Sequence, residues 1–208
     1  AMLWFGWYGF NAGSALAADS LAVHAFITTN TSAAMALISW VLVEKIIHGK
    51  PTVMGAATGA VVGLVAITPG AGFVPIWASF IIGALVSPIC FLFMTKVKSK
   101  FGYDDALDAF GCHGIGGIWG GLATGLFADR SVNDYAKWNG LVFGESKLFI
   151  AQIEGMLITI AWAAVATFII TIALKKLGGI RVSEQAEAQG LDVTEHSESA
   201  YPAFTGLD

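Results

Sequence analysis

The chain has 208 residues, of which 56% are hydrophobic and 12% are charged, and its formal net charge at pH 7 is −4. A soluble domain carries about 25% charged residues, so this composition, with a mean hydropathy of +0.70, excludes an ordinary soluble protein. No charged residue or histidine occurs from Pro51 to Thr95, and this run is long enough for two membrane crossings of roughly 20 residues each.

Six apolar segments follow one another along the chain. They cover about residues 1–18, 21–43, 53–68, 73–95, 107–128 and 148–174. Backbone polar groups in lipid must be paired within the protein, so we predict that each segment is a transmembrane helix. The predicted fold is therefore an all-α integral membrane protein, with a helical bundle over residues 1–181 and a tail over residues 182–208.

The placement of basic residues predicts the orientation of this bundle. Six alternating crossings bring the loops at 44–52 and 96–106 to the same face as the tail. That face carries Lys45, Lys50, Lys96, Lys98, Lys100, Lys175, Lys176 and Arg181, whereas the opposite face carries Arg130, Lys137 and Lys147. Positive charge is enriched on the cytoplasmic side. We therefore predict a multi-pass protein of the cell membrane with its C-terminus in the cytoplasm.

The tail differs in composition from the rest of the chain. From residue 182 onward it has no lysine or arginine. Its acidic residues are Glu184, Glu187, Asp192, Glu195, Glu198 and Asp208. Composition favours a disordered acidic tail, and a folded cytoplasmic extension is the alternative.

Glycines recur at four-residue intervals in two of the apolar segments. One series is Gly55, Gly59 and Gly63; the other comprises Gly117, Gly121 and Gly125, with Gly116 and Gly120 beside it. Small residues at this spacing let helix backbones approach closely. We therefore expect these helices to pack against protein as well as lipid, although a dense bundle without a pore would show the same pattern.

Ionisable residues within membrane spans are costly and mark candidate functional sites. The strongest candidate is His113, which lies in the middle of the fifth segment among glycines. Burial disfavours the imidazolium form, and a neutral ring offers one hydrogen-bond donor and one acceptor. His113 is therefore predicted to accept a proton from ammonium or to bind ammonia, and the alternative is a histidine packed against a neighbouring helix.

The other ionisable residues in the apolar segments have structural interpretations. Asp108 begins the fifth segment, where a carboxylate would cap a helix N-terminus; attracting a cation near the inner mouth is the alternative. Glu154 is expected to form an interhelical hydrogen bond, and His24 to be an interfacial polar group. Cys90 and Cys112 lie at no metal-ligand spacing, so we predict buried thiols and no metal or cofactor.

Aromatic and polar side chains combine on one face of the first segment. Trp7, Phe10 and Ser14 are spaced three and four residues apart and would share that face if the segment is helical. An interfacial aromatic belt is one interpretation. An aromatic face also attracts cations by about 0.5–2 kcal/mol, and a hydroxyl accepts hydrogen bonds from N–H groups, so a site for a small ammonium ion is the other.

Several stretches resemble the Amt/Rh family of ammonium transporters. Residues 3–14 (LWFGWYGFNAGS) are similar to the sixth transmembrane helix of Amt proteins, and residues 108–114 (DAFGCHG) to the tenth. The tail matches the family's cytoplasmic C-terminal region at Gly179–Arg181, Gly190–Asp192, His196 and Ala200–Tyr201. The resemblance runs through the whole chain. It implies the C-terminal half of an eleven-helix fold, helices six to eleven followed by the tail, in agreement with the topology predicted from charge.

The resemblance implies a role for each matching position. Phe10 would be one of two stacked phenylalanines that gate the outer mouth, and Ser14 would belong to the outer site that recruits ammonium. His113 would be the second of two pore histidines, Trp7 would line the inner pore, and Asp108 would open the tenth helix. The tail positions that would couple neighbouring subunits and regulate opening are Gly179, Arg181, Asp192 and Tyr201.

The family's first pore histidine, second gate phenylalanine and recruitment-site tryptophan lie in helices one to five, which have no counterpart in these residues. Because the family's pore lies between the two halves, we expect this chain to need a missing N-terminal half. The resemblance also implies a homotrimer with one pore per subunit and a cytoplasmic regulator of the PII type. No sequence feature points to nucleic acid.

The main functional hypothesis is selective uptake of ammonium. Moving a bare ion into low dielectric costs on the order of 20 kcal/mol before relaxation, so deprotonation at the mouth followed by passage of ammonia is favoured. The alternatives are an ammonium sensor built on the same fold, an Rh-like gas channel and a scaffold that does not transport. An enzyme is not expected, since the sequence shows no nucleophile–base pair or phosphate loop.

Overall fold

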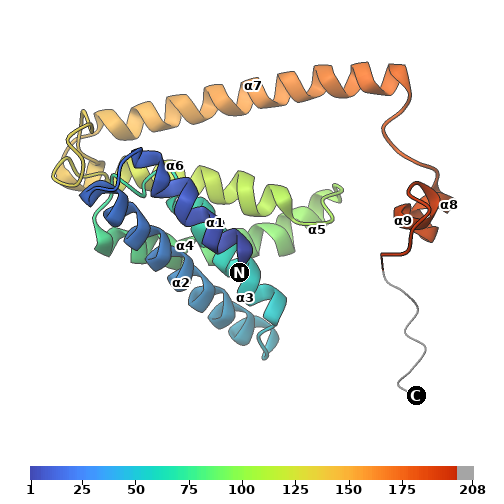
Figure 1. Ribbon diagram of the computed structural model, residues 1–208, viewed down its shortest axis with the longest axis horizontal. Coiled ribbons are helices and arrows are strands. Elements are labelled where there is room, and N and C mark those ends of the chain that lie inside the picture. Colours follow the sequence, from blue (N-terminus) through green and yellow to red (C-terminus); the bar gives the residue numbers. More distant parts are fainter. Residues whose placement is uncertain (201–208) are drawn as a thin grey trace. The chain divides into compact units, whose positions relative to one another are not determined.

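The computed structural model describes residues 1–200, and Tyr201 lies outside this range. All regular structure in these residues is helical, as predicted. The α-helices are α1 (Met2–Asn11), α2 (Ser20–His48), α3 (Val53–Ile67), α4 (Ile76–Leu92), α5 (Lys98–Phe101), α6 (Gly116–Phe127), α7 (Lys147–Leu177), α8 (Glu184–Gln189) and α9 (Leu191–Thr194) (Figure 1). The chain forms two compact units, Ala1–Ile158 and Thr159–Asp208. Their boundary lies within α7, whereas the sequence analysis placed one after residue 181.

The first apolar segment does not form one long helix. The prediction of a helix over residues 1–18 is wrong beyond Asn11, because α1 ends there and a 3₁₀ turn, Gly13–Ala15, follows. Leu16 then adopts a left-handed conformation with φ 58°. Glycine lowers helix propensity and serine competes for backbone hydrogen bonds, and here the Ser14 hydroxyl donates to the carbonyl oxygen of Phe10.

Helix α2 is longer than the apolar segment that predicted it. The Asp19 carboxylate accepts a hydrogen bond from the Ala22 amide at 2.9 Å and caps the N-terminus. The helix passes the predicted end at residue 43 and stops at Gly49, whose φ of +79° suits glycine. Near this end of the helix, the carboxylate of Glu44 accepts a hydrogen bond from the amide of Thr52, the N-cap residue of α3, at 2.7 Å.

Helices α2, α3 and α4 pack around the centre of the first unit (Figure 1). A Cβ atom added to Gly63 of α3 would lie 2.5 Å from the Ala36 Cβ and 2.7 Å from the Ser32 carbonyl oxygen. The Ser32 hydroxyl in turn donates to the Gly63 carbonyl oxygen at 2.9 Å. The predicted close approach of backbones along the glycine series of α3 is therefore confirmed.

The helices differ in their capacity to cross a membrane alone. Three stretches are long and apolar enough, namely Ser20–His48, Ile76–Phe101 and Lys147–Leu177. Helix α3 has 15 residues and spans about 22 Å at 1.5 Å per residue, which is less than the roughly 30 Å of a bilayer core. Helices α1 and α6 are shorter still.

Two π-helical stretches extend the helices of the first unit. The stretch η2 (Phe93–Val97) joins α4 to α5, and η3 (Phe110–Ile115) leads into α6. The predicted helix over residues 107–128 is thus η3 followed by α6, and it begins later than predicted. Single π-turns within helices often occur at functional sites, and η3 contains His113.

The second unit contains the tail residues that the sequence analysis singled out. Gly179 has a φ of +85° after the end of α7. The Arg181 guanidinium donates to both carboxylate oxygens of Glu187, at 2.7 and 3.0 Å. The Asp192 carboxylate accepts a hydrogen bond from the Ala200 amide at 3.0 Å. The acidic stretch at 182–200 therefore folds locally, and disorder, which composition favoured, is not observed for these residues.

Candidate functional site

One end of the first unit holds a cavity of about 490 Å³, here called the Phe10 cavity. Phe10, Asn11 and Ser14 enter it from α1 and the 3₁₀ turn. Asn133 and Tyr135 enter it from the loop at residues 128–146. The structure thus places two predicted site residues, Phe10 and Ser14, on the wall of the same cavity.

The break after α1 orients the two site residues in this cavity. The Ser14 hydroxyl donates its proton to the Phe10 carbonyl oxygen, 2.5 Å away. The lone pairs of that hydroxyl oxygen are therefore available to accept an N–H group. The Phe10 ring is 61% exposed and meets the Trp7 ring edge-on, with 5.9 Å between their centroids. An aromatic face and a hydroxyl acceptor at one opening can hold a small cation with N–H groups.

Two polar contacts fix α1 beside this cavity. The Trp7 indole nitrogen donates to the Thr68 hydroxyl oxygen at 2.8 Å, which holds α1 to the end of α3. The Asn11 side chain is 8% exposed, and its amide nitrogen donates to the Thr29 hydroxyl oxygen at 3.0 Å. Trp7, which the resemblance placed along the inner pore, here contacts Phe10 and anchors its helix.

His113 lies on an open face of the first unit. Its side chain is exposed, and among residues 1–200 it has no described hydrogen-bond partner. Gly117 follows one helical turn later, and a Cβ added there would have no heavy atom within 4 Å. The other glycines of both series would meet a neighbour. The His113 imidazole and the open space at Gly117 therefore lie along the same stretch of helix. The alternative prediction, a histidine packed against a neighbouring helix, is not observed in the described residues.

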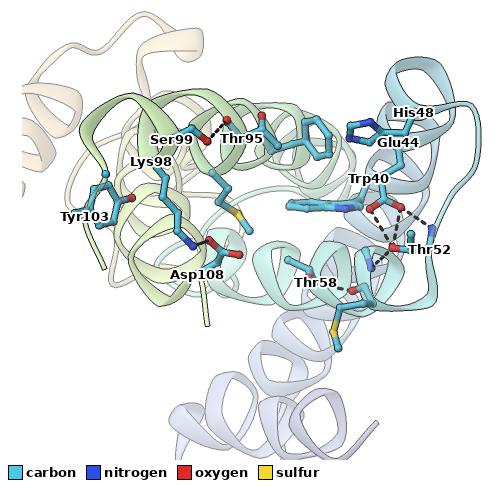
Figure 2. Close-up of a pocket in the computed structure, with 15 residues that line it drawn as sticks. Trp40, Glu44, His48, Thr52, Thr58, Thr95, Lys98, Ser99, Tyr103 and Asp108 are labelled. Atoms are coloured by element: carbon cyan, nitrogen blue, oxygen red, sulfur yellow. Dashed lines mark hydrogen bonds and ion pairs between the residues drawn. The ribbon is translucent and has the colours of Figure 1, made fainter. Parts of the chain in front are cut away.

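The opposite end of the first unit holds a second cavity of about 620 Å³, here called the Trp40 cavity. Figure 2 shows two polar pairs on its walls, Glu44 with Thr52 and Lys98 with Asp108. Glu44 is 8% exposed. From the sequence we assigned Lys98 only to the basic face and made no prediction for Glu44. Neither pairing was predicted, because the partners come from other elements of the fold.

Asp108 does not cap the helix that it precedes, so that prediction is wrong. The carboxylate of Asp105 instead accepts the hydrogen bonds of the Ala109 and Phe110 amides, both at 2.9 Å. The Asp108 backbone is left-handed, with φ 52°, and its carboxylate bonds to the Lys98 ammonium at 2.7 Å. The Asp108 carboxylate is therefore paired with Lys98, and no side-chain cap is seen at the start of η3.

The remaining ionisable candidates divide between packing and exposure. The His24 Nε2 atom lies 2.8 Å from the Val74 carbonyl oxygen, so His24 ties α2 to the turn before α4. Glu154 is exposed, and within residues 1–200 the interhelical hydrogen bond predicted for it is not seen. No three His, Cys, Asp or Glu side chains of these residues converge as metal ligands.

Comparison with known proteins agrees with this geometry. The sequence model of the Ammonium Transporter Family matches residues 1–201. The "Ammonium transporter" of Bacillus subtilis is 52% identical over 201 residues, which cover 97% of this chain and 50% of that protein. The chain spans about half the length of the curated relatives it matches.

Solved structures resemble the fold as well. The crystal structure of Saccharomyces cerevisiae Mep2 has a TM-score of 0.83 and 35% identity, and the match covers 88% of this chain and 42% of Mep2. A structure described as "Sensor Amt Protein" has a TM-score of 0.82 and 27% identity over 93% of this chain and 46% of that one. The apolar helices and the family match together indicate a multi-pass membrane protein. The chain belongs to the Ammonium Transporter Family.

Proposed function

We propose that this chain forms one half of an ammonium transporter pore. Ammonium is recruited at Phe10 and Ser14, gives up a proton to solvent water at this open site, and crosses as ammonia past His113. The observation that carries the proposal is the pairing of an aromatic ring and a hydroxyl acceptor on one cavity wall. The exposed imidazole beside the bare surface of Gly117 adds to it.

The recruitment step uses groups that favour the cation. The exposed Phe10 ring contributes a cation–π contact of about 0.5–1 kcal/mol at an open site and more once water is excluded. The Ser14 oxygen accepts one N–H group. These contacts are far smaller than the penalty of roughly 20 kcal/mol for taking an ion into low dielectric before relaxation. Loss of a proton at the mouth removes most of that penalty.

The conduction step uses the imidazole of His113. A neutral imidazole carries one donor and one acceptor, so it can exchange hydrogen bonds with ammonia without binding a cation strongly. The face that holds it is bare at Gly117 and would be covered in a complete transporter. Helices of an N-terminal half are the proposed cover.

The proposed assembly follows the family. An N-terminal half supplies the remaining pore residues, three such pores form a homotrimer, and the C-terminal tail faces the cytoplasm of a cell membrane. The tail residues Gly179, Arg181, Asp192 and Tyr201 take part in coupling between subunits and in binding a cytoplasmic regulator of the PII type. The eight basic residues predicted for the tail's face support this orientation.

A sensor is the second candidate function, because the chain resembles a structure described as a sensor Amt protein. Uptake measurements separate the two. The chain is produced with an N-terminal half from the Bacillus subtilis relative in cells without ammonium transporters of their own, and each half is also produced alone. The proposal expects uptake of ammonium from the pair and background uptake from either half. Background uptake from a pair that reaches the membrane and assembles would favour a sensor or scaffold.

A further inference from the structure

The loop at residues 128–146 is fixed to the end of the bundle beside the Phe10 cavity. Asn133 is 6% exposed, and its side-chain amide donates to the Gly72 carbonyl oxygen at 3.0 Å. The same side chain accepts a hydrogen bond from the Tyr135 amide through its oxygen, also at 3.0 Å. A third bond joins the Asp129 amide to the Phe73 carbonyl oxygen at 2.8 Å. Asn133 therefore positions Tyr135 relative to the turn that forms one wall of the cavity.

Tyr135 stands at the rim of that cavity with its side chain uncovered. It lines the Phe10 cavity together with Phe10 and Ser14, yet the residue is 90% exposed. Packing therefore does not explain an aromatic residue at this position. Tyr135 also lines a smaller cavity of about 280 Å³, so this residue borders two cavities.

The charges around Tyr135 suit the approach of an external cation. The nearest lysine in the sequence, Lys137, lies over the ring of Trp138, with its Nζ atom 4.8 Å from the centroid. Among the residues that the structure describes, no cation is seen over the Tyr135 ring. Asp134, the preceding residue, is exposed and adds negative charge beside it.

We propose that Tyr135 is a further cation-binding residue of the outer recruitment site, where its ring binds ammonium and small alkylammonium ions before they reach Phe10 and Ser14. This inference rests on the proposed function. An aromatic face at an exposed position attracts a cation weakly, which suits an approach site that must release its ion inward. The contact precedes deprotonation, so it acts on the apparent KM for ammonium and leaves the maximal rate unchanged.

The test compares Tyr135→Leu with Tyr135→Phe in the chain produced with an N-terminal half. Leucine removes the ring, and the expected apparent KM for ammonium and methylammonium rises by roughly two- to fivefold, the factor of a cation–π contact at an exposed site. Phenylalanine keeps the ring, so its KM stays close to that of the parent. Phe143→Leu also replaces an aromatic ring with leucine on the same loop, away from the Phe10 cavity, and should leave KM unchanged.

The outcomes separate this inference from the proposed function. If the parent pair transports and Tyr135→Leu matches it in KM at equal surface abundance, the role of Tyr135 is overturned and the proposed function stands. An equal rise in KM for the leucine and phenylalanine variants overturns the role of the ring. If the assembled parent pair does not transport, the proposed function fails, and the recruitment role of Tyr135 fails with it.

Discussion

The Lys98 ammonium lies 2.7 Å from the Asp108 carboxylate, and this ion pair joins the end of one apolar helix to the start of another. Lys98 begins α5 at the end of the α4–η2 helix, whereas Asp108 lies five residues before His113. Asp108 holds a left-handed backbone at the same point. The ion pair therefore lies just before the π-helical stretch that contains His113.

Two replacements of Asp108 should distinguish the contribution of the ion pair to the free energy of unfolding from that of the left-handed backbone. The two side chains are 26% and 33% exposed, so loss of the pair in Asp108→Asn should cost about 0.5–1 kcal/mol. Asparagine tolerates a left-handed backbone, whereas alanine does not, so Asp108→Ala should cost roughly 1 kcal/mol more. Thermal unfolding of the chain in detergent micelles measures both. Equal losses for the two variants would show that the left-handed backbone carries no cost.

A matched pair of glycines tests the packing of the bundle. Gly63→Ala places a methyl group 2.5 Å from the Ala36 Cβ and 2.7 Å from the Ser32 carbonyl oxygen, and such overpacking costs roughly 1–3 kcal/mol. The methyl group of Gly117→Ala would have no heavy atom within 4 Å. Because alanine is the better helix former, this variant should stabilise the folded chain by up to about 1 kcal/mol. The two variants should shift the unfolding midpoint in opposite directions. Destabilisation by both would contradict an open face at Gly117.

Acidification should weaken two contacts of the tail, with one titration step for each carboxylate. The hydrogen bond from Arg181 lowers the pKa of Glu187 below its ordinary value of 4.5, and the hydrogen bond from the Ala200 amide lowers the pKa of Asp192 below 3.8. Both folded-state pKa values lie below the unfolded ones. The stabilisation is therefore complete above the unfolded pKa values and is lost as the pH falls through the folded ones.

NMR spectra of the Glu187 and Asp192 side chains, recorded for the whole chain in micelles between pH 7 and pH 2, measure these steps. Arg181→Gln should return the pKa of Glu187 towards its ordinary value and leave that of Asp192 unchanged. A Glu187 titration that does not respond to this substitution would contradict the Arg181–Glu187 pairing.

The sequence predicted the class of fold because lipid imposes strong rules on composition and backbone pairing. Long apolar runs predicted helices where α2, α4 and α7 lie, and the glycine spacing predicted the close packing of α3. Hydropathy did not predict the break after Asn11. The break coincides with Gly13, with a hydrogen bond from the Ser14 hydroxyl to the Phe10 carbonyl oxygen and with the left-handed backbone of Leu16, none of which average hydropathy records.

The site was predictable where its residues are neighbours in sequence. Phe10 and Ser14 belong to one motif, and the structure places both on one cavity wall. The position of Tyr135 depends on a tertiary contact between Asn133 and Gly72. The Lys98–Asp108 pair likewise joins α5 to the residues before η3. Residues from such distant elements give no periodic signal. Asp108 was assigned as a helix cap because its position suits one, and its left-handed backbone overrode that local preference.

Uptake of ammonium by a His113 variant tests the central claim most directly. The chain is produced with an N-terminal half, and His113→Ala and His113→Asp are compared with the parent and with His48→Gln, a histidine that lines the Trp40 cavity instead. We predict that both His113 variants lose selective ammonium uptake while His48→Gln retains it, at equal membrane abundance. Uptake by His113→Ala at the parental rate and selectivity would contradict it.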